Sequence, residues 1–186
     1  SNTNYIVMSA FDLKDKDKKK TYRFMETQPI STYVFAFAAG DFAVIDCRGE
    51  ACPRPQASKN VNAGGQGRAQ PLQNSLDVPT KIYVRKSQAE KFKQHAAETF
   101  RLNREAVKYL ETYFDFKFPF PKYDLVLIPE FPFGGMEHAG ATFLRETSVI
   151  FPSEPTANDF ISRANLIFHE AAHQWFGDTV TMRWFD

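Results

Sequence analysis

The residues best suited to chemistry form the run His169-Glu170-Ala171-Ala172-His173. Residues four apart lie on the same face of a helix, so the two histidines can converge on one ion. Imidazole nitrogens suit tetrahedral zinc, which lowers the pKa of a bound water from about 15.7 to near 7. A carboxylate beside the first ligand is placed to take a proton from that water. The run therefore predicts zinc-assisted hydrolysis, with His169 and His173 as ligands and Glu170 as general base.

The surroundings of this run strengthen the zinc interpretation. The bare five-residue pattern also occurs in helices whose histidines bind no metal. Here the neighbouring residues are mostly apolar, namely Phe168, Ala171, Ala172, Trp175 and Phe176. Two histidines and a glutamate buried among such residues are costly unless they bind a metal or another partner. The setting therefore favours a metal site.

A second candidate site is Gly134-Gly135-Met136-Glu137-His138. The two glycines permit a close approach of the backbone to a ligand. The carboxylate of Glu137 can bind a cation, including the free α-ammonium group of a peptide. The alternative is a turn with an exposed glutamate, and this motif taken alone favours that alternative.

Composition excludes several classes of function. The chain has 186 residues, 43% of them hydrophobic, and a net charge of +1 without a basic stripe, which argues against nucleic-acid binding. Its longest apolar run, residues 33–39, is too short to span a membrane. Cys47 and Cys52 are too few for a disulfide scaffold, and their redox state stays open.

Two helices are predicted to carry and support the motifs. The spacing of apolar residues predicts a helix over 157–176, with Thr156 as N-cap, Asp159 three residues later and Gly177 as the stop. A longer helix is predicted over 88–114, opened by a capping box of Ser87 and Glu90. His95 lies beside the apolar stripe of that helix and is expected to be a satisfied or partly exposed side chain, not a ligand.

Strands are predicted from short runs of β-branched and aromatic residues. They fall at 5–11, 21–25, 33–39 and 42–45 in the first quarter of the chain, and at 81–84, 125–128, 142–144 and 149–151 later. Residues 47–75 contain no aromatic residue and several glycines and prolines, which predicts a loop or linker. The pattern thus predicts an α+β fold.

Together the two motifs resemble those of the aminopeptidase N family of zinc gluzincins, marked by G-x-M-E-N upstream of H-E-x-x-H. Gly134-Gly135-Met136-Glu137 matches the first motif, with His138 where Asn is usual. The helix motif continues as in that family, through His173-Gln174-Trp175-Phe176-Gly177-Asp178. Ser31-Thr32-Tyr33 and Gly40-Asp41-Phe42 resemble the end of the family's N-terminal β domain. The resemblance covers nearly the whole chain outside the predicted loop.

This resemblance implies a fold and a set of roles. Residues 1–46 would end an all-β sandwich domain, 47–76 would be a linker, and 77–186 would be the first lobe of a thermolysin-like catalytic domain. His169 and His173 would bind Zn²⁺, and Glu170 would be the general base. Glu137 would hold the free N-terminus of a peptide substrate, beside a peptide lined by Gly134, Gly135, Met136 and His138. The reaction would be removal of N-terminal residues.

Two departures from the family pattern bear on these roles. His138 replaces an Asn that helps to place the peptide, so the subsite preference stays open. The third zinc ligand and the Tyr that assists the oxyanion would lie beyond Asp186, and the amine-binding Gln of the β domain is also missing. The expectation is therefore a fragment that is inactive alone and active within a longer parent. Its open β edges predict self-association.

Three other functions remain open alongside the aminopeptidase. A gluzincin endopeptidase fits the zinc motif, but Glu137 argues for a substrate with a free amine. An epoxide hydrolase would share the Gly-Gly-Met-Glu stretch. A non-catalytic peptide-binding module is disfavoured for the parent because Glu170 accompanies both histidines.

Overall fold

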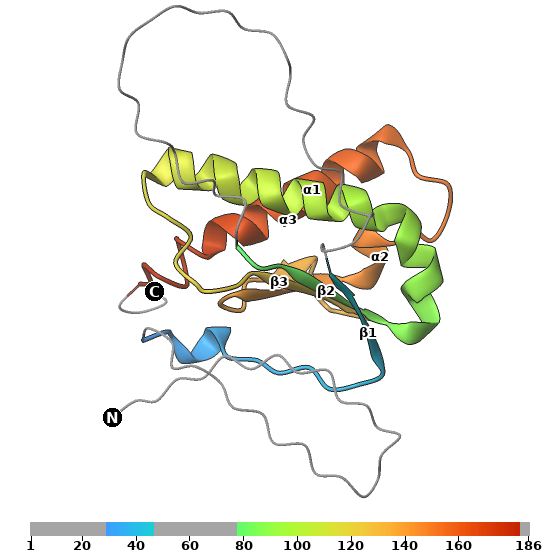
Figure 1. Ribbon diagram of the computed structural model, residues 1–186, viewed down its shortest axis with the longest axis horizontal. Coiled ribbons are helices and arrows are strands. Elements are labelled where there is room, and N and C mark those ends of the chain that lie inside the picture. Colours follow the sequence, from blue (N-terminus) through green and yellow to red (C-terminus); the bar gives the residue numbers. More distant parts are fainter. Residues whose placement is uncertain (1–28, 47–77, 183–186) are drawn as a thin grey trace, which may run out of the picture.

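The computed structural model describes residues 29–46 and 78–182, which build a mixed five-stranded sheet with helices on one face (Figure 1). The strand order is β1-β2-β3-β5-β4. The three inner strands run parallel, and the two edge strands are antiparallel to their neighbours. The strands are β1 (Phe42–Asp46), β2 (Lys81–Arg85), β3 (Asp124–Ile128), β4 (Gly135–Met136) and β5 (Ala141–Arg145).

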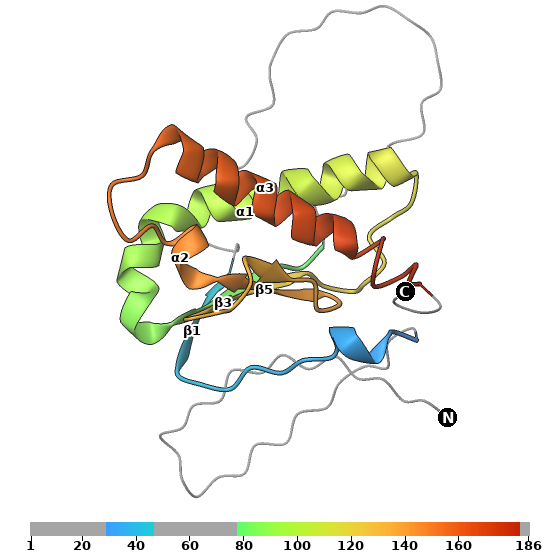
Figure 2. The ribbon, with the colours of Figure 1, turned by 180° about the vertical axis from the view of Figure 1, so that it is seen from behind.

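Two long helices cover one face of this sheet, as Figures 1 and 2 show from opposite sides. They are α1 (Ala89–Phe114), which follows the 3₁₀ turn η3 (Lys86–Gln88), and α3 (Ala157–His173). A short helix, α2 (Glu146–Val149), connects β5 to the loop before α3. Apolar residues of both long helices and of β2, β3 and β5 form a single buried cluster that includes Leu125, Leu127 and Ile167. This core fixes α3 against the sheet.

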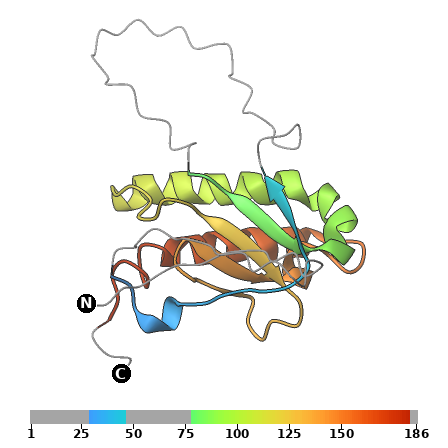
Figure 3. The same ribbon diagram turned by 60° about the horizontal axis from the view of Figure 1, so that its bottom comes forward.

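The other face of the sheet is covered by the N-terminal segment (Figures 1 and 3). Tyr83, Val126 and Phe143 are buried there against Ala36 and Ala38. Because inner parallel strands are buried on both faces, their apolar residues do not alternate with polar ones. The 3₁₀ turn η1 (Thr32–Val34) lies near the start of this segment. The segment places η1 beside the loop that follows β4.

Most predicted elements are present. Strands at 42–45, 81–84, 125–128 and 142–144 and helices at 88–114 and 157–176 are confirmed within a few residues. The capping box at the start of α3 is also confirmed, because Thr156 and Asp159 exchange side-chain and backbone hydrogen bonds. The helix ends at His173, before the predicted end at 176. The strand β4 was not predicted.

The strand predicted at 33–39 is wrong. Residues 32–34 form η1, and residues 35–39 pair with no strand of the described part of the chain. The segment crosses the face of the sheet, where Ala36 and Ala38 are partly buried. Phe35 and Phe37, which alternate with them, are exposed. The segment therefore packs on the sheet without joining its ladder of hydrogen bonds.

Two further local predictions are also wrong. The strand predicted at 149–151 is replaced by α2 and the residues after it, because Val149 and Ile150 are both buried in the helical core. The capping box of Ser87 and Glu90 is absent. The N-cap of α1 is Gln88, which makes no side-chain cap, and Glu90 pairs with Lys93 instead.

The remaining predictions concern other parts of the chain. The strands expected at 5–11 and 21–25, the loop at 47–75 and its two cysteines lie outside the described residues. β1 comes from the segment assigned to an N-terminal β domain, and it pairs with β2 in the common sheet. The division into domains at 46 and 76 stays a prediction, as does self-association through sheet edges.

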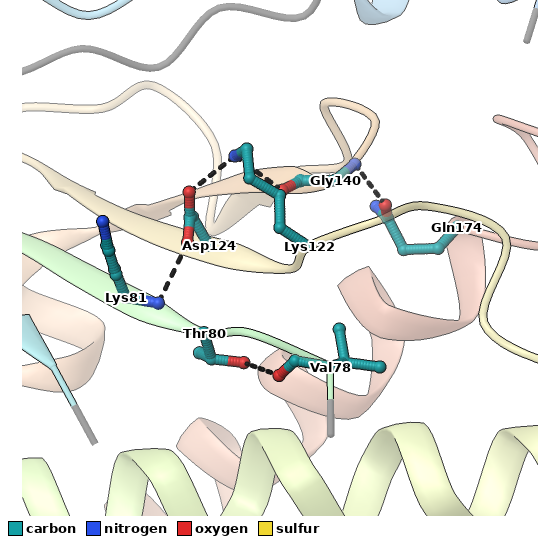
Figure 4. A network of polar contacts seen from close by, with 7 residues as sticks. All are labelled: Val78, Thr80, Lys81, Lys122, Asp124, Gly140 and Gln174. Carbon is teal, nitrogen blue, oxygen red and sulfur yellow. Dashed lines mark hydrogen bonds and ion pairs between the residues drawn. The ribbon is translucent and has the colours of Figure 1, made fainter. Parts of the chain in front are cut away.

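A polar network ties the sheet to the end of α3 (Figure 4). The buried carboxylate of Asp124 accepts from the backbone N–H of Lys81 (2.9 Å) and from Nζ of Lys122 (2.5 Å). Lys122 also donates to the carbonyl of Gly140, whose own N–H donates to Oε1 of the fully buried Gln174 (2.7 Å). The loop between β4 and β5 is thereby fixed relative to α3.

Candidate active site

The two histidines of the predicted zinc motif occupy the last turn of α3. Their Nε2 atoms lie 3.1 Å apart. Two nitrogens bound to one tetrahedral zinc at about 2.0–2.1 Å would be roughly 3.3 Å apart. The structure therefore brings His169 and His173 to a spacing that suits a shared metal ion.

The ring of His173 is oriented by the chain that follows the helix. Its Nδ1 lies 3.0 Å from the carbonyl oxygen of Phe176. A carbonyl can only accept, so Nδ1 carries the proton, and Nε2 of the neutral ring presents its lone pair. A backbone carbonyl on the second ring nitrogen is the usual support of a metal-binding histidine.

Glu170 is buried between α3 and β4. The residue is 4% exposed, and its Oε2 has no hydrogen-bond partner within residues 29–46 and 78–182. Burial raises the pKa of Glu170 to about 7, and the nearby charge of Glu137 raises it further in the same direction. A Cβ atom placed on Gly135 would lie 2.5 Å from Cδ of Glu170. The glutamate therefore fits only because residue 135 has no side chain.

Glu137 is held from two sides. The hydroxyl of Tyr33 donates to Oε1 of Glu137 at 3.2 Å, across 104 residues of sequence. The side-chain amide of Gln174 lies 3.5 Å from the Glu137 carbonyl oxygen. Burial raises the pKa of Tyr33 to about 12, with the charges of Glu137 and Asp178 adding to the effect. Tyr33 was not predicted as a site residue.

His138 has two protein partners of its own. Its Nδ1 lies 3.1 Å from the carbonyl oxygen of Val34, and its ring meets Phe143 edge-on at 4.6 Å between centroids. Burial lowers the pKa of His138 despite its hydrogen bond to Val34. The ring is thus tied to the N-terminal segment and to β5, and its contact with a peptide stays a prediction.

Asp178 is a third carboxylate at the site, and the sequence analysis missed it. It is 2% exposed, and neither of its carboxylate oxygens has a hydrogen-bond partner in the part of the chain that the structure describes. Burial raises the pKa of Asp178 to about 8, with Glu137 and then Glu170 contributing. The sequence feature that could have indicated this carboxylate is an aspartate directly after Gly177, at the end of an apolar run.

We expect Asp178 to make the metal-free chain less stable as pH rises. The pKa of Asp178 is about 8 in the folded chain against 3.8 for a free side chain, so the folded state holds a proton that the unfolded state has released. Between these two values the free energy of unfolding falls by about 1.4 kcal/mol per pH unit. Asp178→Asn should remove the contribution of Asp178 to this slope, leaving that of Glu170, and raise stability most at pH 8.

Urea unfolding at pH 5 and pH 8 measures the effect, with the exposed Asp115→Asn as matched control. The control should keep the slope of the wild-type chain. An Asp178→Asn variant with the same pH slope as the wild type would show that Asp178 is already ionised in the folded chain.

His95, which was expected not to be a ligand, lies away from this site. Its Nδ1 is 3.3 Å from Nη1 of the buried Arg163, and its Nε2 is 3.3 Å from the amide of Gln94.

No group of three histidine, cysteine or acidic side chains within 29–46 and 78–182 has an arrangement that would hold a metal ion.

Comparison with known proteins places this site in a family. The model of the peptidase family M1 domain matches residues 98–186. The probable aminopeptidase 2 of Sulfurisphaera tokodaii is 33% identical over 180 residues, or 96% of this chain and 19% of that protein. The aminopeptidase N of Streptomyces lividans is 34% identical over 169 residues, or 91% and 17%. The glutamyl aminopeptidase of Mus musculus is 31% identical over 176 residues, or 94% and 15%.

The chain belongs to peptidase family M1. The predicted resemblance is thereby confirmed. This M1 chain spans less than a fifth of the length of these curated relatives. Both of its motifs fall inside the matched residues 98–186, whereas Tyr33 lies outside them. Among the helices of the described part, none is long and apolar enough to cross a membrane.

Proposed function

We propose that this chain carries part of the active site of a zinc-dependent aminopeptidase, which removes N-terminal residues from peptides. The observation that carries the proposal is the convergence of His169 and His173 next to a buried Glu170, whose Oε2 has no hydrogen-bond partner among the described residues. The aminopeptidase names of the similar M1 proteins agree with it. The proposal applies to the natural polypeptide that contains these residues.

The residues present fit a zinc ion. Two imidazole nitrogens converge at 3.1 Å, and Nδ1 of His173 faces the Phe176 carbonyl, which leaves Nε2 for a metal ion. His169 and His173 would hold the ion. Zinc bound there would supply Lewis-acid polarisation of the scissile carbonyl and activation of water near neutral pH.

Glu170 would move the proton. With a pKa of about 7, its carboxylate is matched to accept a proton from the attacking water and to pass it to the leaving amine at neutral pH. Packing of the Glu170 side chain against β4 restricts the movement of its carboxylate. The burial and the raised pKa of Glu170 support this role.

The peptide would lie along β4 with its amino terminus at Glu137. β4 is an edge strand, paired only with β5 in the described sheet. An exposed edge offers backbone groups to an extended peptide. Gly134, Gly135 and Met136 would line this peptide, and the Glu137 carboxylate would bind its α-ammonium group. This arrangement would make the enzyme an exopeptidase.

The test compares amino-acid 4-nitroanilides that carry a free amine with their N-acetylated counterparts, using the natural polypeptide with and without a chelator. We expect only the free-amine substrates to be cleaved, cleavage to stop on chelation, and zinc to restore it. Equal cleavage of both substrates would indicate an endopeptidase. Cleavage that resists the chelator would exclude the zinc mechanism.

Metal binding provides a readout that does not need activity. The chain of residues 1–186 is expected to bind zinc weakly through its two motif histidines, and His173→Ala should abolish this binding in a calorimetric titration. A Cys47→Ser/Cys52→Ser variant controls for binding by thiols. A tight equimolar zinc complex that survives His173→Ala would contradict the assignment.

A further inference from the structure

We infer that Tyr33 is a positioning residue for the amine anchor: its hydroxyl holds Oε1 of Glu137 and leaves Oε2 to receive the substrate's α-ammonium group. The inference rests on the proposed function and deepens it. It adds to the site a residue of the N-terminal segment, outside the matched peptidase domain.

The position of Tyr33 is set by the fold. Its neighbour Val34 is 1% exposed and packs in a small cluster with Phe120 and Ala139. The carbonyl oxygen of Val34 also contacts Nδ1 of His138 at 3.1 Å. Two adjacent residues of η1 thus contact two adjacent residues of the loop after β4. The packed backbone of η1 therefore places the Tyr33 hydroxyl next to Glu137.

The end of α3 closes the other side of Tyr33. A Cβ atom on Gly177 would lie 3.1 Å from the Tyr33 oxygen and 3.3 Å from Nδ1 of His173. Gly177 has a φ of +138°, which side-chain-bearing residues rarely adopt. The hydroxyl therefore sits in a narrow space between Glu137 and the metal-binding turn. The charges that act on it come from Glu137 and Asp178.

The direction of the hydrogen bond follows from the chemistry of the pair. Tyr33 keeps its proton at neutral pH, so its hydroxyl donates and the carboxylate accepts. Hydrogen bonds to a charged group are stronger than neutral ones. Oε1 of Glu137 has this partner, whereas Oε2 has no hydrogen-bond partner among the described residues. The carboxylate is thereby fixed in orientation before a substrate arrives, which lowers the entropic cost of binding.

The kinetic test is Tyr33→Phe in the natural polypeptide. Loss of one hydrogen bond to a charged anchor should raise KM for free-amine anilides by about 3- to 10-fold. The value of kcat should stay nearly unchanged, because Glu170 and the histidines are untouched. Tyr113→Phe, at an exposed position of α1, is the matched control and should alter neither constant. A fall in kcat with unchanged KM would overturn the inference, since it would indicate a structural or chemical role.

A binding test separates this inference from the proposed function. Leucinamide and N-acetyl-leucinamide are titrated into the chain, and NMR follows the binding of each compound to the wild type, Glu137→Gln and Tyr33→Phe. We expect the wild type to prefer leucinamide, Glu137→Gln to lose the preference, and Tyr33→Phe to weaken leucinamide binding alone.

The outcomes are distinguishable. If Glu137→Gln removes the preference and Tyr33→Phe binds leucinamide like the wild type, the inference is overturned and the amine anchor stands. If the wild type shows no preference, the amine anchor fails, and the inference fails with it.

Discussion

Replacing Glu170 with glutamine is expected to lower kcat by about 10²- to 10⁴-fold, the range for loss of a general base, while zinc binding is retained. Glutamine has nearly the same shape as glutamate, so it fits the space beside Gly135. Its amide cannot accept a proton at neutral pH. Steady-state kinetics on a free-amine anilide and a zinc titration measure the two effects separately.

Glu90→Gln is the matched control, because Glu90 is an exposed glutamate on α1 that pairs with Lys93, away from the candidate site. It should behave like the wild type in both measurements. A Glu170→Gln enzyme with wild-type kcat would remove Glu170 from the proposed chemistry. A variant that also lost zinc would show that Glu170 supports the metal and not the proton transfer alone.

Glu170→Gln should also raise the free energy of unfolding of the metal-free chain above pH 5. Burial raises the pKa of Glu170 from 4.5 to about 7, so ionisation of this group opposes folding as pH rises through that interval. The uncharged amide removes this opposition. A stability gain together with a loss of activity is the signature of a residue whose strained environment serves catalysis.

The helix α3 could be predicted from the sequence because its signals are local. The spacing of His169 and His173 specifies a common face on any helix, and the capping box of Thr156 and Asp159 specifies where that helix begins. Both depend on residues within one turn of each other. The end of the helix at His173 is set by later contacts, among them the hydrogen bond from its ring to Phe176, and it was placed less accurately.

The contact between Tyr33 and Glu137 could not be predicted in this way. It joins residues 104 positions apart, and it depends on a segment that crosses the face of the sheet. A continuous apolar run such as residues 33–39 is compatible both with a strand inside a sheet and with a chain packed on the face of one. The burial of Asp178 is equally non-local, because it results from the way the turn after α3 folds toward Glu137 and Tyr33. Tertiary packing thus decided those parts of the site that lie outside the two motifs.

Gly135→Ala is expected to lower kcat/KM by about 10²-fold, the cost of a misplacement near 1 Å at a catalytic group. The added Cβ would overlap Cδ and Cγ of Glu170, at 2.5 and 2.7 Å. Backbone strain is not the cause, because Gly135 is not among the glycines of positive φ. The carboxylate of Glu170 must therefore shift from its present position beside β4.

The neighbouring glycine offers a close comparison. A Cβ on Gly134 would meet only Cδ1 of Leu166, at 3.2 Å, and the end of that side chain can shift. Gly134→Ala should therefore cause a clearly smaller loss than Gly135→Ala. Equal losses in the two variants would mean that the glycines act through the peptide and not through the base.

A double variant tests the route of the effect. If Gly135→Ala acts by displacing the carboxylate, adding it to Glu170→Gln should reduce kcat little further, because the base is already absent. Two mutations that act independently would instead multiply their effects. Full multiplication would place Gly135 in peptide binding alone. Strong non-additivity would show that Gly135 acts by leaving room for the side chain of Glu170.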